Sequence, residues 1–249
     1  MLQANAQSDM DERTIRFGLM AAPNFGWIQP GLKEITKDGL QSKIGFGYGL
    51  MCDYKFSSSP NYLLATGINI TTNGGGMVEP WDTTVIVPGI DTSSYLGRVK
   101  RTHRFQYVNV PILLKMRTNE IGYMTYFGSI GFDLGFRTRA RVDNKYTWQG
   151  NVGPADEKDL DNVRNIRFLR IGLNITLGAE YNLSGNTNAY LGIGWHNSFT
   201  NMYRSIPQNR IIQPDDEGFP KLDANGNPIY GPVKKAVTNY ISLDVGVFF

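Results

Sequence analysis

Two side chains at the end of a predicted strand have the types that a hydrolytic site needs. His196 and Ser198 lie two residues apart, so in an extended strand both side chains point to the same face. A histidine can act as the base for a serine hydroxyl, and a carboxylate would complete the arrangement. The alternation around them places both on the face that carries Gly192 and Gly194, opposite the apolar positions. We therefore expect the pair to face inward, away from any lipid.

Charged residues form a second group, because they alternate with apolar positions in several segments. One interpretation is a pore lining or an anion site, and the other is a filled interior in which opposite charges pair. Isolated buried ions are very costly, which favours pairing. The predicted members of this lumen charge network are Asp53, Lys55, Asp133, Arg137, Arg170, Glu180 and Asp244. Arg139 and Arg141 continue the face of Arg137, and we expect them beyond the membrane, where they can contact lipopolysaccharide phosphates or a partner.

The chain offers few ligands to a metal ion. His103 and His196 are the only histidines and Cys52 is the only cysteine, which excludes a His-rich metal site, a multi-Cys zinc site and an internal disulfide. The segment Asp223–Pro228 begins like a calcium loop, but proline occupies its sixth position and no glutamate follows at the twelfth. Asn-Gly and Asn-Pro favour turns, so we predict a hairpin tip there and expect no metal and no cofactor.

Composition excludes several classes of protein. Aromatic residues make up 12% of the 249 residues and charged residues 19%. A disordered chain would have fewer aromatic residues and more charge, so this class is excluded. No run of 18 apolar residues exists, so a membrane-spanning helix is not expected. The net charge of +3 comes without a basic stripe, so we expect no nucleic-acid partner.

Eight segments alternate apolar with small or polar residues, the pattern of a strand with two different faces. They are longer than the five or six residues, roughly, of a strand in a soluble protein, and match the ~9–11 residues that cross a membrane. The second face is rich in glycine, as a narrow closed barrel requires. The segments are approximately 15–28, 44–56, 62–72, 104–116, 130–137, 169–183, 189–199 and 241–249. Pro111 is expected to mark a bulge or bend.

The predicted links alternate strictly between short and long. Short links cover 57–61, 117–121 and 184–187, and long links cover 31–42, 73–103, 143–165 and 200–236. Outer-membrane barrels have short periplasmic turns and long extracellular loops. The sequence therefore predicts an all-β protein, an eight-stranded antiparallel transmembrane β-barrel. Ten strands remain the alternative if part of 73–103 or 200–236 pairs within the membrane.

Aromatic residues fall at the ends of the predicted strands, where amphipathic rings prefer the two membrane interfaces. Those at the short-turn ends are Tyr54, Phe56, Tyr62, Tyr126, Tyr181 and Phe249. Those near the long-loop ends are Trp27, Tyr107, Phe136 and Trp195.

The first residues favour export. Ala4-Asn5-Ala6 fits the small-x-small pattern before a signal-peptidase site. We therefore expect residues 1–6 to be the remnant of a signal peptide and residues 7–249 to form the barrel.

One segment resembles a known family. Tyr107-Val-Asn-Val-Pro-Ile-Leu-Leu-Lys115 is similar to the Tyr-x-x-x-Pro-Leu-Leu-Leu-Lys strand of the PorT family of small outer-membrane β-barrels. Gly45–Leu50 and Gly128–Gly135 are similar to other strands of these barrels, and the resemblance spans about 15–249. The final Phe249 resembles the C-terminal assembly signal of outer-membrane barrels. The family's known members have no catalytic residues, so the resemblance implies no enzyme.

The resemblance implies a place in the outer membrane of a Gram-negative bacterium. The named family member is required for type IX secretion, which exports folded cargo carrying a C-terminal signal. We therefore expect a non-enzymatic accessory component that docks other secretion proteins and contacts outer-membrane lipid and lipopolysaccharide. The alternatives are a hydrolase that modifies lipid A through His196 and Ser198, since lipid A deacylases are small barrels with a similar His-x-Ser pair, and a small adhesion or membrane-integrity barrel.

Overall fold

The computed structural model describes residues 14–33, 35, 42–56, 59, 61–85, 93–147, 155–213, 221–227 and 229–249. The predicted signal-peptide remnant, residues 1–6, lies outside these ranges. The long strands are β1 (Ile15–Pro30), β2 (Lys43–Lys55), β3 (Tyr62–Val85), β4 (Ser93–Arg117), β5 (Met124–Thr147), β7 (Leu169–Ser184), β8 (Thr187–Ser198) and β11 (Ala236–Phe248). The short elements are β6 (Glu157–Asp161), η1 (Pro207–Asn209), β9 (Arg210–Ile212) and β10 (Tyr230–Val233).

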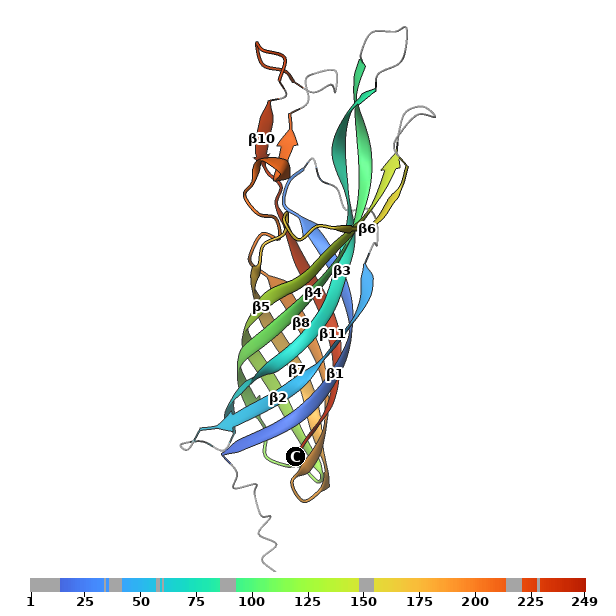
Figure 1. Ribbon diagram of the computed structural model, residues 1–249. Coiled ribbons are helices and arrows are strands. Elements are labelled where there is room, and N and C mark those ends of the chain that lie inside the picture. The colour runs from blue at the N-terminus through green and yellow to red at the C-terminus, as the bar shows by residue number, and fades with distance from the viewer. Residues whose placement is uncertain are drawn as a thin grey trace, which may run out of the picture.

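These eight long strands close into an antiparallel barrel (Figure 1). The first and last strands pair directly, with Gly18 opposite Phe248, and β4 pairs with β5 on the far side of the ring. The short strand β6 only extends the upper part of β5, while β9 and β10 form a separate two-stranded sheet. The predicted eight-stranded barrel is therefore confirmed, and the described parts of 73–103 and 200–236 add no further strand to it. Among the described residues, no helix is long and apolar enough to span a membrane.

The barrel has a turn end and a loop end. The turn end holds the short links β2–β3, β4–β5 and β7–β8, together with the C-terminus (Figure 1). The loop end differs from the prediction in one respect, because most of the expected loop 73–103 is strand. Glu79 pairs with Val99, and the pairing of β3 with β4 continues as far as Val85 and Ser93. These two strands project beyond the barrel as a long hairpin (Figure 1).

The two faces of the strands are those that the alternation predicts. The outer wall exposes large apolar side chains around the whole ring, including Leu19, Leu50, Phe132, Leu177 and Ile193. The aromatic residues predicted at the turn end are all exposed, from Phe56 at 37% to Phe249 at 52%. Tyr107 is an exception among those predicted at the loop end: it is 2% exposed and faces the interior.

A bulge in β5 reverses the faces near the loop end. Gln106 of β4 pairs with Arg139 and Tyr107 pairs with Arg137, so Thr138 is an extra residue on β5. The prediction that Arg139 and Arg141 share the face of Arg137 is therefore wrong. Above the bulge the inward positions are Ala140, Val142 and Asn144, which are all buried. Pro111, where a bulge was expected, pairs with Asp133 without any shift in register.

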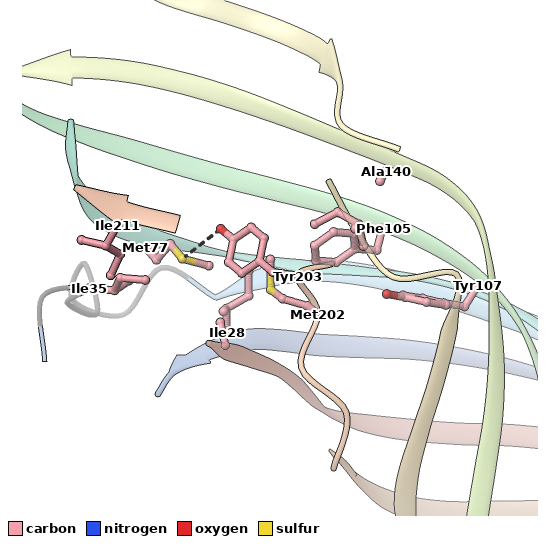
Figure 2. Packing of buried hydrophobic residues seen from close by; sticks show 11 residues of the cluster. Ile28, Ile35, Met77, Phe105, Tyr107, Ala140, Met202, Tyr203 and Ile211 are labelled. Atoms are coloured by element: carbon pink, nitrogen blue, oxygen red, sulfur yellow. Dashed lines mark hydrogen bonds between the residues drawn. The ribbon is translucent and has the colours of Figure 1, made fainter. Parts of the chain in front are cut away.

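A cap closes the loop end of the barrel. The segment after β8 folds back over the opening and buries Met202, Tyr203 and Ile211 against β1, β3 and β4. Figure 2 shows Tyr203 in the middle of this cluster, between Met77 of β3 and Phe105 of β4. Polar and apolar residues of the predicted loop 200–236 thus form a second core above the membrane-spanning wall.

Candidate functional site

Four charged side chains form an ion cluster in the lumen near the turn end. Arg16 of β1 donates to Asp53 at 2.8 Å and to Glu180 at 3.0 Å. Lys115 of β4 donates to the same two carboxylates, at 2.8 and 2.6 Å. All four side chains are nearly inaccessible to solvent, so two buried positive charges face two buried negative charges, and the partly exposed Arg117 lies 3.6 Å from Glu180 at the edge of the cluster. Each carboxylate is thereby shared between both cations.

Aromatic rings fill the space around this ion cluster. The Lys115 ammonium lies 4.6 Å from the centre of the Phe127 ring and 4.7 Å from that of Phe248. Tyr190 stacks on Phe127 with ring centres 4.9 Å apart. A cation over an aromatic face is attracted by the ring quadrupole, most strongly where water is excluded. The rings and ions together plug the lumen at this level.

Two of the predicted network residues, Asp53 and Glu180, belong to this ion cluster. Lys55 lies two residues further along β2, half-buried at the turn end. The sequence reasoning missed Arg16 and Lys115, which supply the two fully buried positive charges of the cluster. Arg16 lies two positions before Gly18 in the alternation of β1, and this position could have revealed it.

A second polar cluster lies in the middle of the lumen. Asp133 Oδ2 is 2.7 Å from Nδ1 of His196, and Nε2 of His196 is 3.2 Å from Oγ of Ser242. The His196 ring stacks on Tyr240, with ring centres 4.0 Å apart. A Cβ atom at Gly194 would lie 2.7 Å from Ser242 Oγ and 2.9 Å from His196 Nε2. Glycine at 194 is therefore what leaves room for the contact between histidine and serine.

The order carboxylate, imidazole and hydroxyl is that of a base-activated nucleophile. The serine in this arrangement is Ser242, whereas Ser198 Oγ lies near the carbonyl oxygen of Thr200, at 3.5 Å. The predicted pair of His196 and Ser198 does point inward, but each residue has other hydrogen-bond partners. The lumen beside Ser242 holds a cavity of about 70 Å³. At roughly 10–15 Å³ for each molecule, this is room for a handful of waters rather than for an acyl chain.

The remaining predicted network residues lie at different heights in the lumen. Arg170 donates to Oδ1 of Asn109 at 3.0 Å, and its guanidinium lies 4.7 Å from the centre of the Tyr107 ring. Asp244 lies beside Gly194, since a Cβ atom there would be 3.2 Å from its Oδ2. Arg137 is half-buried and donates from Nε to the main-chain carbonyl of Arg167 at 3.3 Å.

A third charged group holds the cap on the hairpin of β3 and β4. Glu79 is completely buried and accepts hydrogen bonds from Lys234 and from the Tyr203 hydroxyl, and Arg101 lies 3.4 Å away. Although burial alone would raise it, these partners lower the pKa of Glu79 to about 2. Burial lowers the pKa of His103, whose ring stacks on Phe105, to about 3. The sequence reasoning missed this group because it assigned these residues to loops.

Two further sequence predictions can be placed in the structure. Asp223 Oδ1 accepts hydrogen bonds from the backbone N–H groups of Asn225 and Asn227, at 2.8 and 2.9 Å, and Gly226 has a φ of 79°. This is the predicted turn, and the described residues contain no group of three potential metal ligands. Phe249 donates its N–H to the carbonyl of Phe17 at 2.9 Å, at the turn end.

Residues 5–204 match the model of a protein family described as outer membrane protein beta-barrel domain. Among solved structures, Neisserial surface protein A aligns with 93% of this chain and 95% of its own, at 13% identity and a TM-score of 0.41. Ail from Yersinia pestis aligns with 94% of this chain and 97% of its own, at 10% identity and a TM-score of 0.34. OprG from Pseudomonas aeruginosa aligns with 94% of each chain, at 13% identity and a TM-score of 0.34. No curated protein matches the sequence.

Proposed function

The chain belongs to the outer membrane protein β-barrel domain family and lies in the outer membrane of a Gram-negative bacterium, and we propose that it works there as a non-enzymatic docking component. In this proposal the barrel is an anchor, and the described parts of the loop end bind other proteins. Its partners are components of type IX secretion.

The filled lumen is the observation that carries the proposal. Arg16, Asp53, Lys115 and Glu180 pair across the lumen near the turn end, and the cap built around Tyr203 covers the loop end. An eight-stranded barrel is just wide enough for its own side chains. A barrel filled in this way supports a role for the surfaces of the protein rather than for transport through it.

The type IX assignment comes from the resemblance of residues 107–115 to the PorT strand motif. Lys115, the last residue of that motif, joins Asp53 to Glu180 in the lumen. This contact explains why a barrel of this kind needs a lysine at the end of the motif. We extend the family's role in secretion to this chain as a proposal.

Deleting the gene tests the assignment to secretion. In the bacterium that encodes this chain, we expect cargo with type IX signals to accumulate inside the cell. A copy of the gene in which an Asn-Gly turn replaces residues 80–98 keeps the barrel and the Glu79–Val99 pair but shortens the hairpin. We expect this copy to fold and not to restore secretion. Normal export of cargo in the deletion strain would refute the assignment.

The long hairpin also favours a second candidate, a surface adhesin or membrane-integrity barrel. The strands β3 and β4 have 24 and 25 residues, whereas β8 has 12, so the hairpin extends well beyond the membrane-spanning wall. In the same two strains, loss of cell attachment or of detergent resistance together with normal cargo export would support this candidate instead.

The hydrolase alternative now depends on Ser242 as well as on His196. A fluorophosphonate probe labels serine hydroxyls that a base has activated, and we expect no labelling of the folded barrel. Labelling that disappears in the Ser242→Ala variant but persists in Ser198→Ala would show an active nucleophile and overturn the non-enzymatic proposal.

A further inference from the structure

We propose that a basic cleft on the outer wall of the barrel binds a phosphate group of lipopolysaccharide. The basic cleft is defined by Lys43 of β2, Arg104 of β4, and Arg139 and Arg141 of β5, and it has a volume of about 280 Å³. Its three arginines leave β4 and β5 on the outward face, whereas Lys43 lies on the opposite face of β2 from the exposed Ile44 and lines the cleft at the end of that strand.

The height of the cleft matches the outer headgroup region of the membrane. Reading across the sheet, Ile70, Val108 and Phe136 form one row of paired positions on the outward face. The next outward row towards the loop end is Thr72, Gln106 and Arg139, and the row after that contains Arg104 and Arg141. The apolar wall therefore ends directly below the arginines. Because long loops are extracellular in such barrels, this border is the outer leaflet, where lipopolysaccharide carries its phosphates.

The β5 bulge is what assembles the cleft. With a regular strand, Arg139 and Arg141 would face the interior together with Arg137. The extra residue Thr138 turns both arginines outward, next to Arg104 on the neighbouring strand. Bulges often re-aim side chains at functional positions.

Charge is in excess at the cleft. Arg104 pairs with Asp143 at 2.8 Å and with Asp159 at 3.1 Å, and Arg141 lies 3.8 Å from Asp159. The side chains of Lys43 and Arg139 have no hydrogen-bond or ion-pair partner in the described part of the chain. The cleft thus holds four cations, and only Arg104 and Arg141 are paired with the two carboxylates. The Asp159 side chain is 65% exposed and that of Arg104 is 41% exposed, so these pairs are weak enough for a phosphate to join them.

Backbone contacts hold the arginines of the cleft in place. Arg141 Nη1 donates to the carbonyl oxygen of Asp159 at 3.0 Å, and the N–H of Asp159 donates to Asp143 at 2.8 Å. Asp159 has a φ of 55°, a left-handed conformation that is uncommon outside glycine. An arginine fork that is already oriented loses little side-chain entropy when it binds a phosphate.

A lipid explains the surroundings of the cleft better than a soluble phosphate does. Ile44, which lines the cleft beside Lys43, is 80% exposed and belongs to the outer wall. A ligand with a phosphate at the level of Arg139 and acyl chains along this wall contacts both the basic side chains and the apolar surface. An inorganic phosphate contacts only the basic side chains.

The test measures binding of lipid A by the purified barrel in detergent micelles. The ligands are phosphorylated lipid A, the same lipid A after enzymatic removal of its phosphates, and inorganic phosphate. The variant Lys43→Ala/Arg139→Ala removes the two unpartnered cations. The matched control, Lys33→Ala/Arg164→Ala, removes the same charge from exposed positions away from the cleft.

We expect the cleft variant to lose roughly 30-fold in affinity for phosphorylated lipid A, since each basic residue at an anionic surface contributes about a factor of five. The control variant should bind like the wild type, and dephosphorylated lipid A should bind weakly to all three proteins. An equal loss in both variants would show a general charge effect and overturn the proposal. Binding of inorganic phosphate as tight as that of lipid A would refute the lipid assignment, and full binding of dephosphorylated lipid A would refute recognition of the phosphate.

Discussion

Replacing Lys115 with methionine should destabilise the barrel strongly, although the two side chains have similar lengths. Lys115 is 2% exposed and bridges Asp53 and Glu180, so its loss leaves Arg16 as the only fully buried cation beside two buried carboxylates in the described cluster, with the partly exposed Arg117 3.6 Å from Glu180. Removing one partner of a buried ion pair costs about 3–5 kcal/mol, because the remaining charge is uncompensated. We expect a loss of this size in the free energy of unfolding of Lys115→Met.

A second substitution separates the charge effect from a packing effect. In Lys115→Met/Glu180→Gln, the pair of Arg16 and Asp53 remains balanced at 2.8 Å. The double variant should therefore recover a large part of the lost stability, which a packing defect would not do. Lys33→Met, at an exposed position, should stay within about 0.5 kcal/mol of the wild type.

The assay is urea unfolding of the barrel in lipid vesicles, followed by tryptophan fluorescence and by the mobility of the folded protein in gels. The reasoning would be refuted if Lys115→Met unfolded within about 0.5 kcal/mol of the wild type. It would also be refuted if the double variant were less stable than Lys115→Met, since then the excess negative charge would not be the cause of the loss.

Three further predictions test the cap, the wall and the orientation. Because its partners lower the pKa of Glu79 to about 2 in the folded protein, its carboxylate stabilises the cap above about pH 4.5, by roughly 3 kcal/mol, and loses this effect as the pH falls towards 2. Burial lowers the pKa of His103 to about 3, so the folded cap favours the neutral imidazole and loses stability as the pH falls below about 6.5. Hydrogen exchange in the cap should therefore rise at acidic pH before the barrel unfolds. Leu173→Arg places a charge in hydrocarbon and should cost about 2–4 kcal/mol in vesicle unfolding, and an unchanged stability would refute the register of β7. In a Cys52→Ser background, Asp223→Cys should react with an impermeant thiol reagent on intact cells and Glu120→Cys should not, whereas the reverse result would invert the barrel.

The sequence alone determined which residues face inward over most of the barrel. Alternation is a local property, because successive side chains of a strand point to opposite faces whatever the neighbouring strands do. This is why Asp53, Asp133 and Glu180 could be placed in the lumen, and why the short turns could be located. The need for buried charges to pair follows equally from the residue types.

Only the tertiary structure decided which charges meet. Arg16 and Glu180 are 164 residues apart, and their contact depends on barrel closure and on the stagger of every intervening strand. The same holds for Ser242, which meets His196 across two paired strands in place of Ser198.

The structure of the loop end could not be predicted from the alternation of apolar and polar residues either. Thr138 carries no signal of a bulge, yet its extra position reverses the faces of Arg139 and Arg141. Residues 73–103 show no clear alternation, because above the membrane neither lipid nor a narrow lumen demands it. Their strands are recognisable only once β3 and β4 pair, and the burial of Tyr203 against them depends on chain segments that meet only in the folded protein.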